Sequence, residues 1–204
     1  MPGMILYESQ ISGNCHKVRQ MLALRGMQYE SREVDVIDRS KRSELLGDLN
    51  PSLTVPVLIL DDGRSLGESN AILCFLARGT EYLPDDPFEQ AKVLQWLFFE
   101  QYSHEPNIAV ARFLLTYSDR PVPEEYVARL QTLGNRALAA MDHSLAGADF
   151  LACGRFTIAD IALYAYTHVA HEGGFDLALY PNVQAWIGRV RSQEGQFDMP
   201  SPAA

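Results

Sequence analysis

Strand patterns occur only before residue 80 of this 204-residue chain, and helical patterns alone follow them. In the first part, short apolar runs alternate with stretches in which apolar side chains recur every three or four residues. These are the spacings of strands and helices, respectively. The change falls where Gly, Thr, Pro and Asp cluster at residues 79–87. We therefore predict two domains, residues 1–79 and residues 87–204, joined by a linker at residues 80–86.

The first domain is predicted to be a mixed sheet with helices on both faces. Its strands are expected at residues 4–7, 29–36, 57–60 and 64–66, and its helices at residues 15–26, 40–49 and 69–77. Asn14 is expected to cap the first helix and Gly26 to end it. A βαβ unit, a helix, a β-hairpin and a last helix, in this order, make the α/β thioredoxin-like arrangement.

The second domain is predicted to be all-helical. Helical apolar spacing runs through residues 88–117, 123–145 and 157–171. The start of the last helix has a capping-box pattern, in which Thr157 caps the N–H of Asp160 and the Asp160 carboxylate reaches back. The fold class is therefore a thioredoxin-like N-terminal domain followed by an all-α C-terminal domain.

The charge balance argues against two classes of partner. Seventeen Lys and Arg residues against 26 Asp and Glu residues give a net charge of -9, which repels nucleic acids and anionic lipid surfaces. The longest apolar runs, such as Val93–Phe99 and Ile161–Tyr166, are much shorter than the roughly 20 residues of a spanning helix. No secretory signal is visible at the N-terminus. We expect a cytoplasmic protein that binds neither nucleic acid nor membrane.

The cysteines and histidines suggest neither a disulfide framework nor a metal site. Cys15, Cys74 and Cys153 are odd in number and show no CxxC spacing, which fits free thiols in a reducing compartment. His168 and His171 are three residues apart and have no clear third ligand, so we predict no metal. Cys15 is expected to pack as a small hydrophobic side chain and is assigned no chemistry.

The first of three distinctive loops is Ser12–Gly13–Asn14–Cys15, between the first strand and the first helix. Redox proteins of this fold carry CxxC here, whereas this chain has a hydroxyl at the first position. A serine O–H can donate a hydrogen bond to a bound thiolate, and a helix N-terminus adds positive potential. Both effects lower the pKa of a ligand thiol. The alternative is that the loop is only a turn with a helix cap.

The second loop is Asn50–Val57, in which Pro56 directly precedes a strand. A cis peptide bond at this proline would leave the backbone of Val55 exposed beside the Ser12 loop. Free N–H and C=O groups there could pair with the backbone of a bound peptide, as in strand addition. A rigid turn ahead of an edge strand explains the same residues equally well.

The third loop, Gly67–Glu68–Ser69–Asn70, joins a strand directly to a helix. A helix N-terminus attracts carboxylates, and the Ser69 hydroxyl can add a hydrogen bond. Glu68 could pair with an ammonium group, so the two residues together suit an α-amino acid head group, such as the γ-glutamyl end of glutathione. Alternatively, both residues only cap the helix.

Taken together, these segments resemble the glutathione transferase superfamily, in particular its bacterial, serine-type cytosolic members. The resemblance spans nearly the whole chain and rests on five motifs, Ser-Gly-Asn-Cys-His-Lys-Val, Asn-Pro-Ser-Leu-Thr-Val-Pro-Val-Leu, Glu-Ser-Asn-Ala-Ile, Phe-Thr-Ile-Ala-Asp-Ile-Ala-Leu-Tyr and Tyr-Pro-Asn-Val-Gln-Ala-Trp. It implies a homodimeric enzyme of detoxification, in which glutathione attacks a small hydrophobic electrophile as a thiolate and no metal takes part.

The resemblance also implies roles for individual residues. Ser12 would activate the thiol, the backbone of Val55 beside a cis Pro56 would hold the peptide, and Glu68 and Ser69 would anchor the γ-glutamyl group. The remaining assignments are Lys41 for the glycyl carboxylate and Tyr102 and Arg112, on the long helix, for the electrophile pocket.

Two other functions remain open at this point. The same thiolate could reduce peroxides or disulfides in a glutathione-dependent peroxidase or disulfide reductase. A non-catalytic, glutathione-binding regulatory protein could keep the fold without turnover.

Overall fold

The structure is a computed structural model that describes residues 3–200. Its N-terminal part contains one four-stranded sheet in the order β2-β1-β3-β4, with β1 parallel to β2 and antiparallel to β3. The strands are β1 Met4–Glu8, β2 Tyr29–Glu33, β3 Val57–Ile59 and β4 Ser65–Leu66. The mixed sheet expected from the sequence is confirmed.

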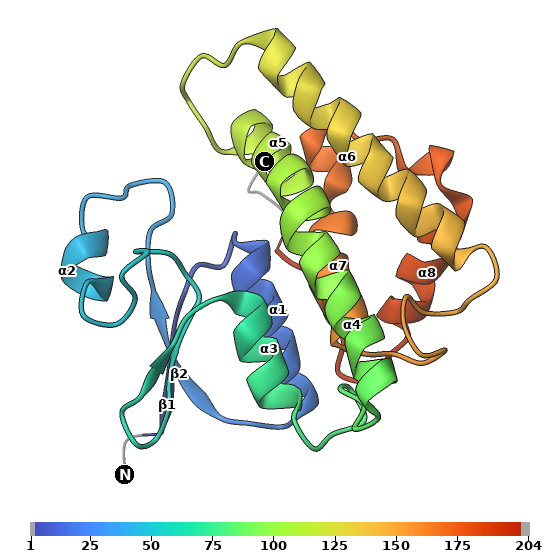
Figure 1. Ribbon diagram of the computed structural model, residues 1–204. Helices are drawn as coiled ribbons and strands as arrows, with labels where there is room; N and C mark the ends of the chain where they lie inside the picture. Colours follow the sequence, from blue (N-terminus) through green and yellow to red (C-terminus); the bar gives the residue numbers. More distant parts are fainter. Residues whose placement is uncertain (1–2, 201–204) are drawn as a thin grey trace.

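Helices cover both faces of this sheet (Figure 1). Helices α1 (Gly13–Leu24) and α3 (Ser69–Ala77) lie between the sheet and the C-terminal helices, whereas α2 (Arg42–Leu46) lies apart from them. A small separate core of Val34, Leu46 and Val57 holds α2.

Two elements of this domain, β2 and α2, are shorter than predicted by more than one residue. Strand β2 ends at Glu33, opposite Glu8 at the end of β1, because the ladder has no partner residues beyond that pair. The polar helix expected at residues 40–49 is helical only in α2, whose single buried residue is Leu46. A helix with so little apolar surface to bury gains little from packing.

The C-terminal part is all-helical, as predicted. It contains α4 Pro87–Phe99, a π-helical turn Glu100–His104, α5 Glu105–Thr116, α6 Glu124–Leu145, α7 Ile158–Thr167 and α8 Pro181–Arg191, with 3₁₀ turns at Ala170–Gly173 and Leu177–Leu179. The long helix expected at residues 88–117 is interrupted by the π-helical turn. Pro106 explains the interruption, since it lacks an N–H and its ring would clash with the carbonyl of Tyr102 in a regular helix.

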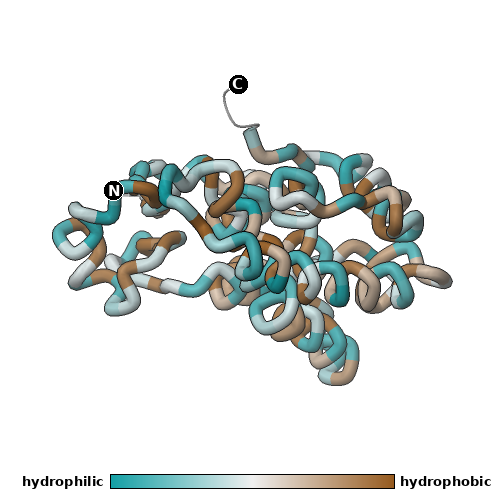
Figure 2. Tube along the Cα trace, turned by 90° about the horizontal axis from the view of Figure 1, so that it is seen from above, coloured by the Kyte–Doolittle hydropathy of each residue, from teal (hydrophilic) through white to brown (hydrophobic). Residues whose placement is uncertain are grey.

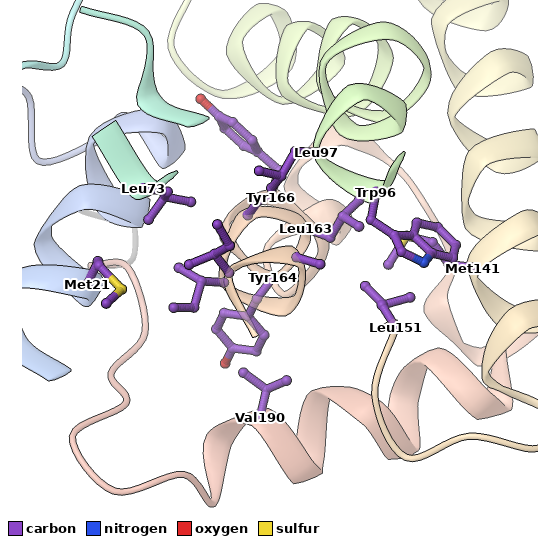
Figure 3. Close-up of a cluster of buried hydrophobic side chains, with 14 of the residues drawn as sticks. Met21, Leu73, Trp96, Leu97, Met141, Leu151, Leu163, Tyr164, Tyr166 and Val190 are labelled. Atoms are coloured by element: carbon purple, nitrogen blue, oxygen red, sulfur yellow. The ribbon is translucent and has the colours of Figure 1, made fainter. Parts of the chain in front are cut away.

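Helix α7 is buried along its whole length and forms the centre of the molecule (Figure 3). The predicted capping box at its start is confirmed, because the Asp160 carboxylate accepts the backbone N–H of Thr157 at 2.9 Å. The same carboxylate accepts the indole N–H of Trp186 on α8 at 2.9 Å. Met21 of α1, Leu73 of α3 and Leu97 of α4 belong to one buried cluster with α7, so the two parts of the chain share a core.

Hydrophobic and hydrophilic residues alternate along the trace (Figure 2). None of the helices within residues 3–200 combines the length and the apolar character needed to cross a bilayer.

Candidate functional site

A cavity of about 360 Å³ lies where the loops of the N-terminal part face α5 and α7. Its volume is within the usual range of small-molecule sites. One wall comes from the N-terminal part and consists of Ile11, Ser12, Asn14, Val36, Arg39, Arg42, Thr54 and Val55. The other wall comes from α5, the residue that follows it and α7, and consists of Glu105, Ala109, Val110, Arg112, Phe113, Tyr117 and Tyr166.

Ser12 is the N-cap of α1, and its hydroxyl oxygen accepts the backbone N–H of Cys15 at 3.3 Å. The prediction that Asn14 caps this helix was wrong, because the helix begins at Gly13 and Asn14 already lies in its first turn. Accepting a bond occupies a lone pair of the Ser12 oxygen and leaves the O–H free to donate. Ser12 therefore presents a donor on the cavity wall, at the positive end of a 12-residue helix.

The side chain of Asn14 is held from both ends. Its carbonyl oxygen accepts the ammonium group of Lys17 at 2.8 Å, and its NH₂ group donates to Glu105 at 3.2 Å. Lys17 also donates to the Ser69 hydroxyl at 3.3 Å and pairs with Glu100 at 2.9 Å. Since Lys17 and Glu100 are both 0% exposed, this ion pair is fully buried between α1 and the π-helical turn.

Burial raises the pKa of the Glu105 carboxyl on the cavity wall. The charge of Lys17 and the hydrogen bond from Asn14 oppose this rise, whereas the nearby Glu100 and Glu68 carboxylates add to it. Near Glu105, acidic side chains therefore outnumber the one buried cation, which favours positive charge in a ligand at this end of the cavity.

The peptide bond between Val55 and Pro56 is cis, as the family resemblance implied. Val55 lines the cavity directly ahead of β3, and Pro56 is buried. The Val55 backbone thus lies on the same wall as Ser12.

Glu68 and Ser69 lie at the start of α3, beside the cavity rather than on its wall. Glu68 is exposed and has φ of 63°, a left-handed conformation that is strained for a residue other than glycine. Ser69 is buried, and its hydroxyl contacts the Lys17 ammonium group and the Asn14 carboxamide. The buried cation thus connects the third loop to the first.

Lys41 is exposed and lies outside this cavity, against a separate hollow beside Asp38. Its neighbours Arg39 and Arg42 line the cavity instead. The Arg42 guanidinium donates to the carbonyl oxygens of Leu53 at 3.3 Å and Val36 at 3.2 Å. The Arg42 Nε is buried without a partner among the described residues, so part of its donor capacity is unused. The basic run at residues 39–42 was visible in the sequence, but not which of its members faces the cavity.

The two residues predicted for the electrophile pocket lie in different places. Arg112 lines the cavity but is only 3% exposed, because its guanidinium holds Glu172 at 2.5 Å, the Ile11 carbonyl at 2.8 Å and the Tyr117 hydroxyl at 2.8 Å. Tyr102 is 87% exposed and borders another hollow, with Phe99 and Arg136. The structure therefore brings Arg112 to the cavity and leaves Tyr102 outside it.

Tyr166 of α7 was not singled out from the sequence. Its side chain reaches from the central helix to the start of α1, where its hydroxyl oxygen accepts the backbone N–H of Asn14 at 3.3 Å (Figure 3). Burial raises the pKa of this hydroxyl, so it is protonated at neutral pH. Nothing in its local sequence pattern distinguishes it from the core residues around it.

Cys15 is fully buried, and burial raises the pKa of its thiol to about 11, although the backbone N–H of Ser9 donates a hydrogen bond to the sulfur at 3.4 Å and opposes the rise. It packs as a protonated, small side chain, as expected. The Nδ1 of His168 forms a hydrogen bond with the carbonyl oxygen of Tyr164 at 2.7 Å, and His171 is exposed. Within residues 3–200, no group of three or more His, Cys, Asp or Glu side chains is arranged to hold a metal ion.

Comparison with known proteins agrees with this geometry. The family models for the glutathione S-transferase N-terminal domain and C-terminal domain match residues 11–78 and 104–194. A crystal structure of a glutathione S-transferase from Pseudomonas fluorescens is 47% identical, with a TM-score of 0.92 over 97% of this chain and 99% of that one. One from Xanthobacter autotrophicus is 44% identical, with a TM-score of 0.93 over 98% of both chains.

A further relative has a different activity in its name. The disulfide-bond oxidoreductase YfcG of Escherichia coli is 29% identical over 188 residues, which cover 88% of this chain and 86% of that protein. With both domain models matched and close structural neighbours along nearly its whole length, the chain belongs to the glutathione S-transferase family.

Proposed function

We propose that this protein is a glutathione transferase that joins the thiolate of glutathione to a small hydrophobic electrophile. The observation that carries the proposal is the position of Ser12. Its hydroxyl lies at the N-terminus of α1, on the wall of a cavity whose opposite wall is built by α5 and α7. A thiol bound there meets a hydrogen-bond donor and a positive helix end, and both stabilise its charged form.

The surrounding groups fit the other parts of glutathione. The backbone of Val55 can pair with the cysteinyl residue, and Glu68 and Ser69 can hold the ammonium and carboxylate of the γ-glutamyl group. For the glycyl carboxylate, Arg42 is placed better than Lys41, because its side chain lines the cavity and a guanidinium suits a carboxylate. Glutathione is the only co-substrate that this mechanism requires, and no step uses a metal.

The electrophile would lie against α5. Ala109, Val110 and Phe113 give this wall an apolar surface, and Tyr117 adds a second aromatic ring. Arg112 contributes by fixing the wall, since its guanidinium is committed to Glu172 and to the Ile11 carbonyl. Holding the thiolate and the electrophile in one cavity raises their effective concentration, which supplies much of the rate.

The homodimer and the cytoplasmic location inferred from the sequence stay predictions. For the dimer, large aromatic side chains are exposed on α3, α4 and the π-helical turn, among them Phe75 at 47%, Phe98 at 72% and Tyr102 at 87%. Exposed apolar groups of this size favour burial against another subunit. Sedimentation of the purified protein would test this prediction.

A second candidate activity is the glutathione-dependent reduction of disulfides or peroxides. The similarity to YfcG favours it, because that relative is named for disulfide-bond chemistry. The same thiolate at Ser12 could attack a sulfur or a peroxide oxygen. Assays with a dialkyl disulfide, an organic hydroperoxide and an aromatic halide, run side by side, would rank the three reactions.

The decisive experiment is a titration of the glutathione complex by thiolate absorbance. A free thiol titrates near ~8.5, and we expect the bound thiol to titrate about one to two units lower. Ser12→Ala should remove much of this shift and lower kcat more than glutathione affinity, whereas Ser12→Thr, which keeps a hydroxyl and a helix cap, should retain it. A bound thiol that titrates like free glutathione in the wild type would refute the proposal and favour a non-catalytic binding protein.

A further inference from the structure

Tyr166 lies on α7 in the C-terminal part of the chain, and its side chain contacts the start of α1, next to Ser12. Its ring packs against Gly13, where a Cβ atom would lie 2.6 Å from the ring carbons. Its hydroxyl oxygen is fixed by the backbone N–H of Asn14 at 3.3 Å. The position of the ring and the position of the hydroxyl are therefore both determined by α1.

The hydroxyls of Tyr166 and Ser12 are held in the same way. Ser12 accepts the N–H of Cys15, and Tyr166 accepts the N–H of Asn14, which is the neighbouring donor in the first turn of the helix. Both side chains line the same cavity. Two hydroxyl groups therefore lie at the N-terminus of α1, on the wall of the same cavity.

The hydroxyl of Tyr166 still has a proton to donate. A tyrosine hydroxyl is both a donor and an acceptor, and its bond with Asn14 uses only the acceptor. Within residues 3–200, no side chain or carbonyl accepts the Tyr166 proton in a hydrogen bond. A buried, protonated hydroxyl on a cavity wall favours a ligand that carries an acceptor at that point.

We propose that the hydroxyl of Tyr166 donates a second hydrogen bond to the sulfur of bound glutathione, beside that of Ser12. The inference rests on the proposed function, which places the sulfur at the start of α1. The thiolate would then be held by one donor from each part of the chain, and the N–H of Asn14 strengthens the Tyr166 donor by polarising it.

The charged groups that face this hydroxyl come from α5, and they act in opposite directions. The Glu105 carboxylate raises the pKa of the Tyr166 hydroxyl, and the Arg112 guanidinium lowers it. From α1, the Cys15 side chain is a neutral thiol because burial raises its pKa to about 11. Tyr166 thus stays a donor across the pH range in which a glutathione thiol ionises.

The test compares Tyr166→Phe with Tyr164→Phe. Phenylalanine keeps the ring against Gly13 and removes only the hydroxyl. Tyr164 lies on the same helix, but its ring points to the opposite side from that of Tyr166 (Figure 3). Its hydroxyl donates to Asp198. The pKa of the bound glutathione thiol is measured by thiolate absorbance for both variants, for Ser12→Ala and for the Ser12→Ala/Tyr166→Phe double variant.

Tyr166→Phe should raise the pKa of the bound thiol by about one unit, and the double variant should raise it further than either single variant. Tyr164→Phe should leave it unchanged. Binding of S-methylglutathione, which has no ionisable thiol, should be the same in Tyr166→Phe and wild type, a result that a merely structural role would not give. If Tyr166→Phe does not fold, 3-fluorotyrosine at position 166, a stronger donor of the same shape, should lower the thiol pKa.

A Tyr166→Phe complex whose thiol titrates as in wild type overturns the inference and leaves the role of Ser12 intact. An unchanged pKa of the bound thiol in the protein with 3-fluorotyrosine at position 166 would also overturn the inference. A wild-type protein that binds no glutathione, or binds it without lowering the thiol pKa, overturns the proposed function and this inference together.

Discussion

The buried ion pair between Lys17 and Glu100 allows a quantitative test of how the two parts of the chain are joined. Both side chains are 0% exposed and 2.9 Å apart, and Lys17 also donates to Asn14 and Ser69. Lys17→Met keeps the length of the side chain but leaves Glu100 as a buried charge without its cation. Breaking a buried pair in this way costs about 3–5 kcal/mol. A domain has a total stability of about 5–15 kcal/mol, so the loss is a large part of the whole.

Urea unfolding followed by tryptophan fluorescence, at one fixed protein concentration, would measure the loss. With a slope of about 2 kcal/mol per molar urea, the midpoint of Lys17→Met should fall by about 2 M. The control is Arg64→Met, which breaks an ion pair with Asp62 whose side chains are 76% and 53% exposed, so the urea midpoint should change little. In Lys17→Met/Glu100→Gln no buried charge remains, so part of the stability should return.

A Lys17→Met protein that loses no more stability than Arg64→Met would refute this reasoning. It would mean that Glu100 finds water or another cation once Lys17 is gone. Equal stability of the single and double variants would contradict the argument that the unpaired charge causes the loss.

Three further predictions follow from the same structure. Gly13→Ala should destabilise the fold by about 1–3 kcal/mol, because its Cβ would lie 2.6 Å from the Tyr166 ring. The control Gly147→Ala, whose Cβ would have no atom within 4 Å, should leave the stability unchanged. Equal urea midpoints for the two variants would contradict this prediction. Glu68→Gln should raise the glutathione KM and leave kcat unchanged, because it removes a charge that pairs with the ligand ammonium; an unchanged KM excludes that contact. Burial and the neighbouring His168 lower the pKa of His16 from 6.5 to about 3, so the unfolded chain binds a proton that the folded chain does not. Stability should therefore fall between pH 6.5 and about 3, and His16→Met should flatten this decline in urea midpoints; parallel pH profiles would refute the assignment.

Much of the fold could be predicted because its signals are local. The capping box of Thr157 and Asp160 involves residues three positions apart, and the structure contains it as predicted. The order of strands and helices follows from apolar spacing within short windows. The errors differ in cause: β2 ends where its partner strand ends, which is a tertiary limit, whereas the long helix is interrupted at Pro106, a local signal that apolar spacing does not take into account.

The candidate site was predictable only in part, for the same reason. Ser12 and Val55 lie on the cavity wall because each occupies a loop whose place in the fold is set by the order of the elements. Lys41 and Tyr102 lie outside it, since a basic or aromatic residue in a helical pattern does not reveal which way its face turns once the helix is packed. Arg42 lines the cavity one position away from the residue that was chosen.

By itself, the sequence determined the two-domain architecture, the family and two of the loops on one wall of the cavity, those of Ser12 and Val55. Only the tertiary structure decided what faces those loops. The contact between Tyr166 and Asn14 spans 152 positions, and the ion pair between Lys17 and Glu100 spans 83. Periodicity and capping act over a few residues, whereas a cavity wall is made of side chains that become neighbours only when separate helices pack around a shared core.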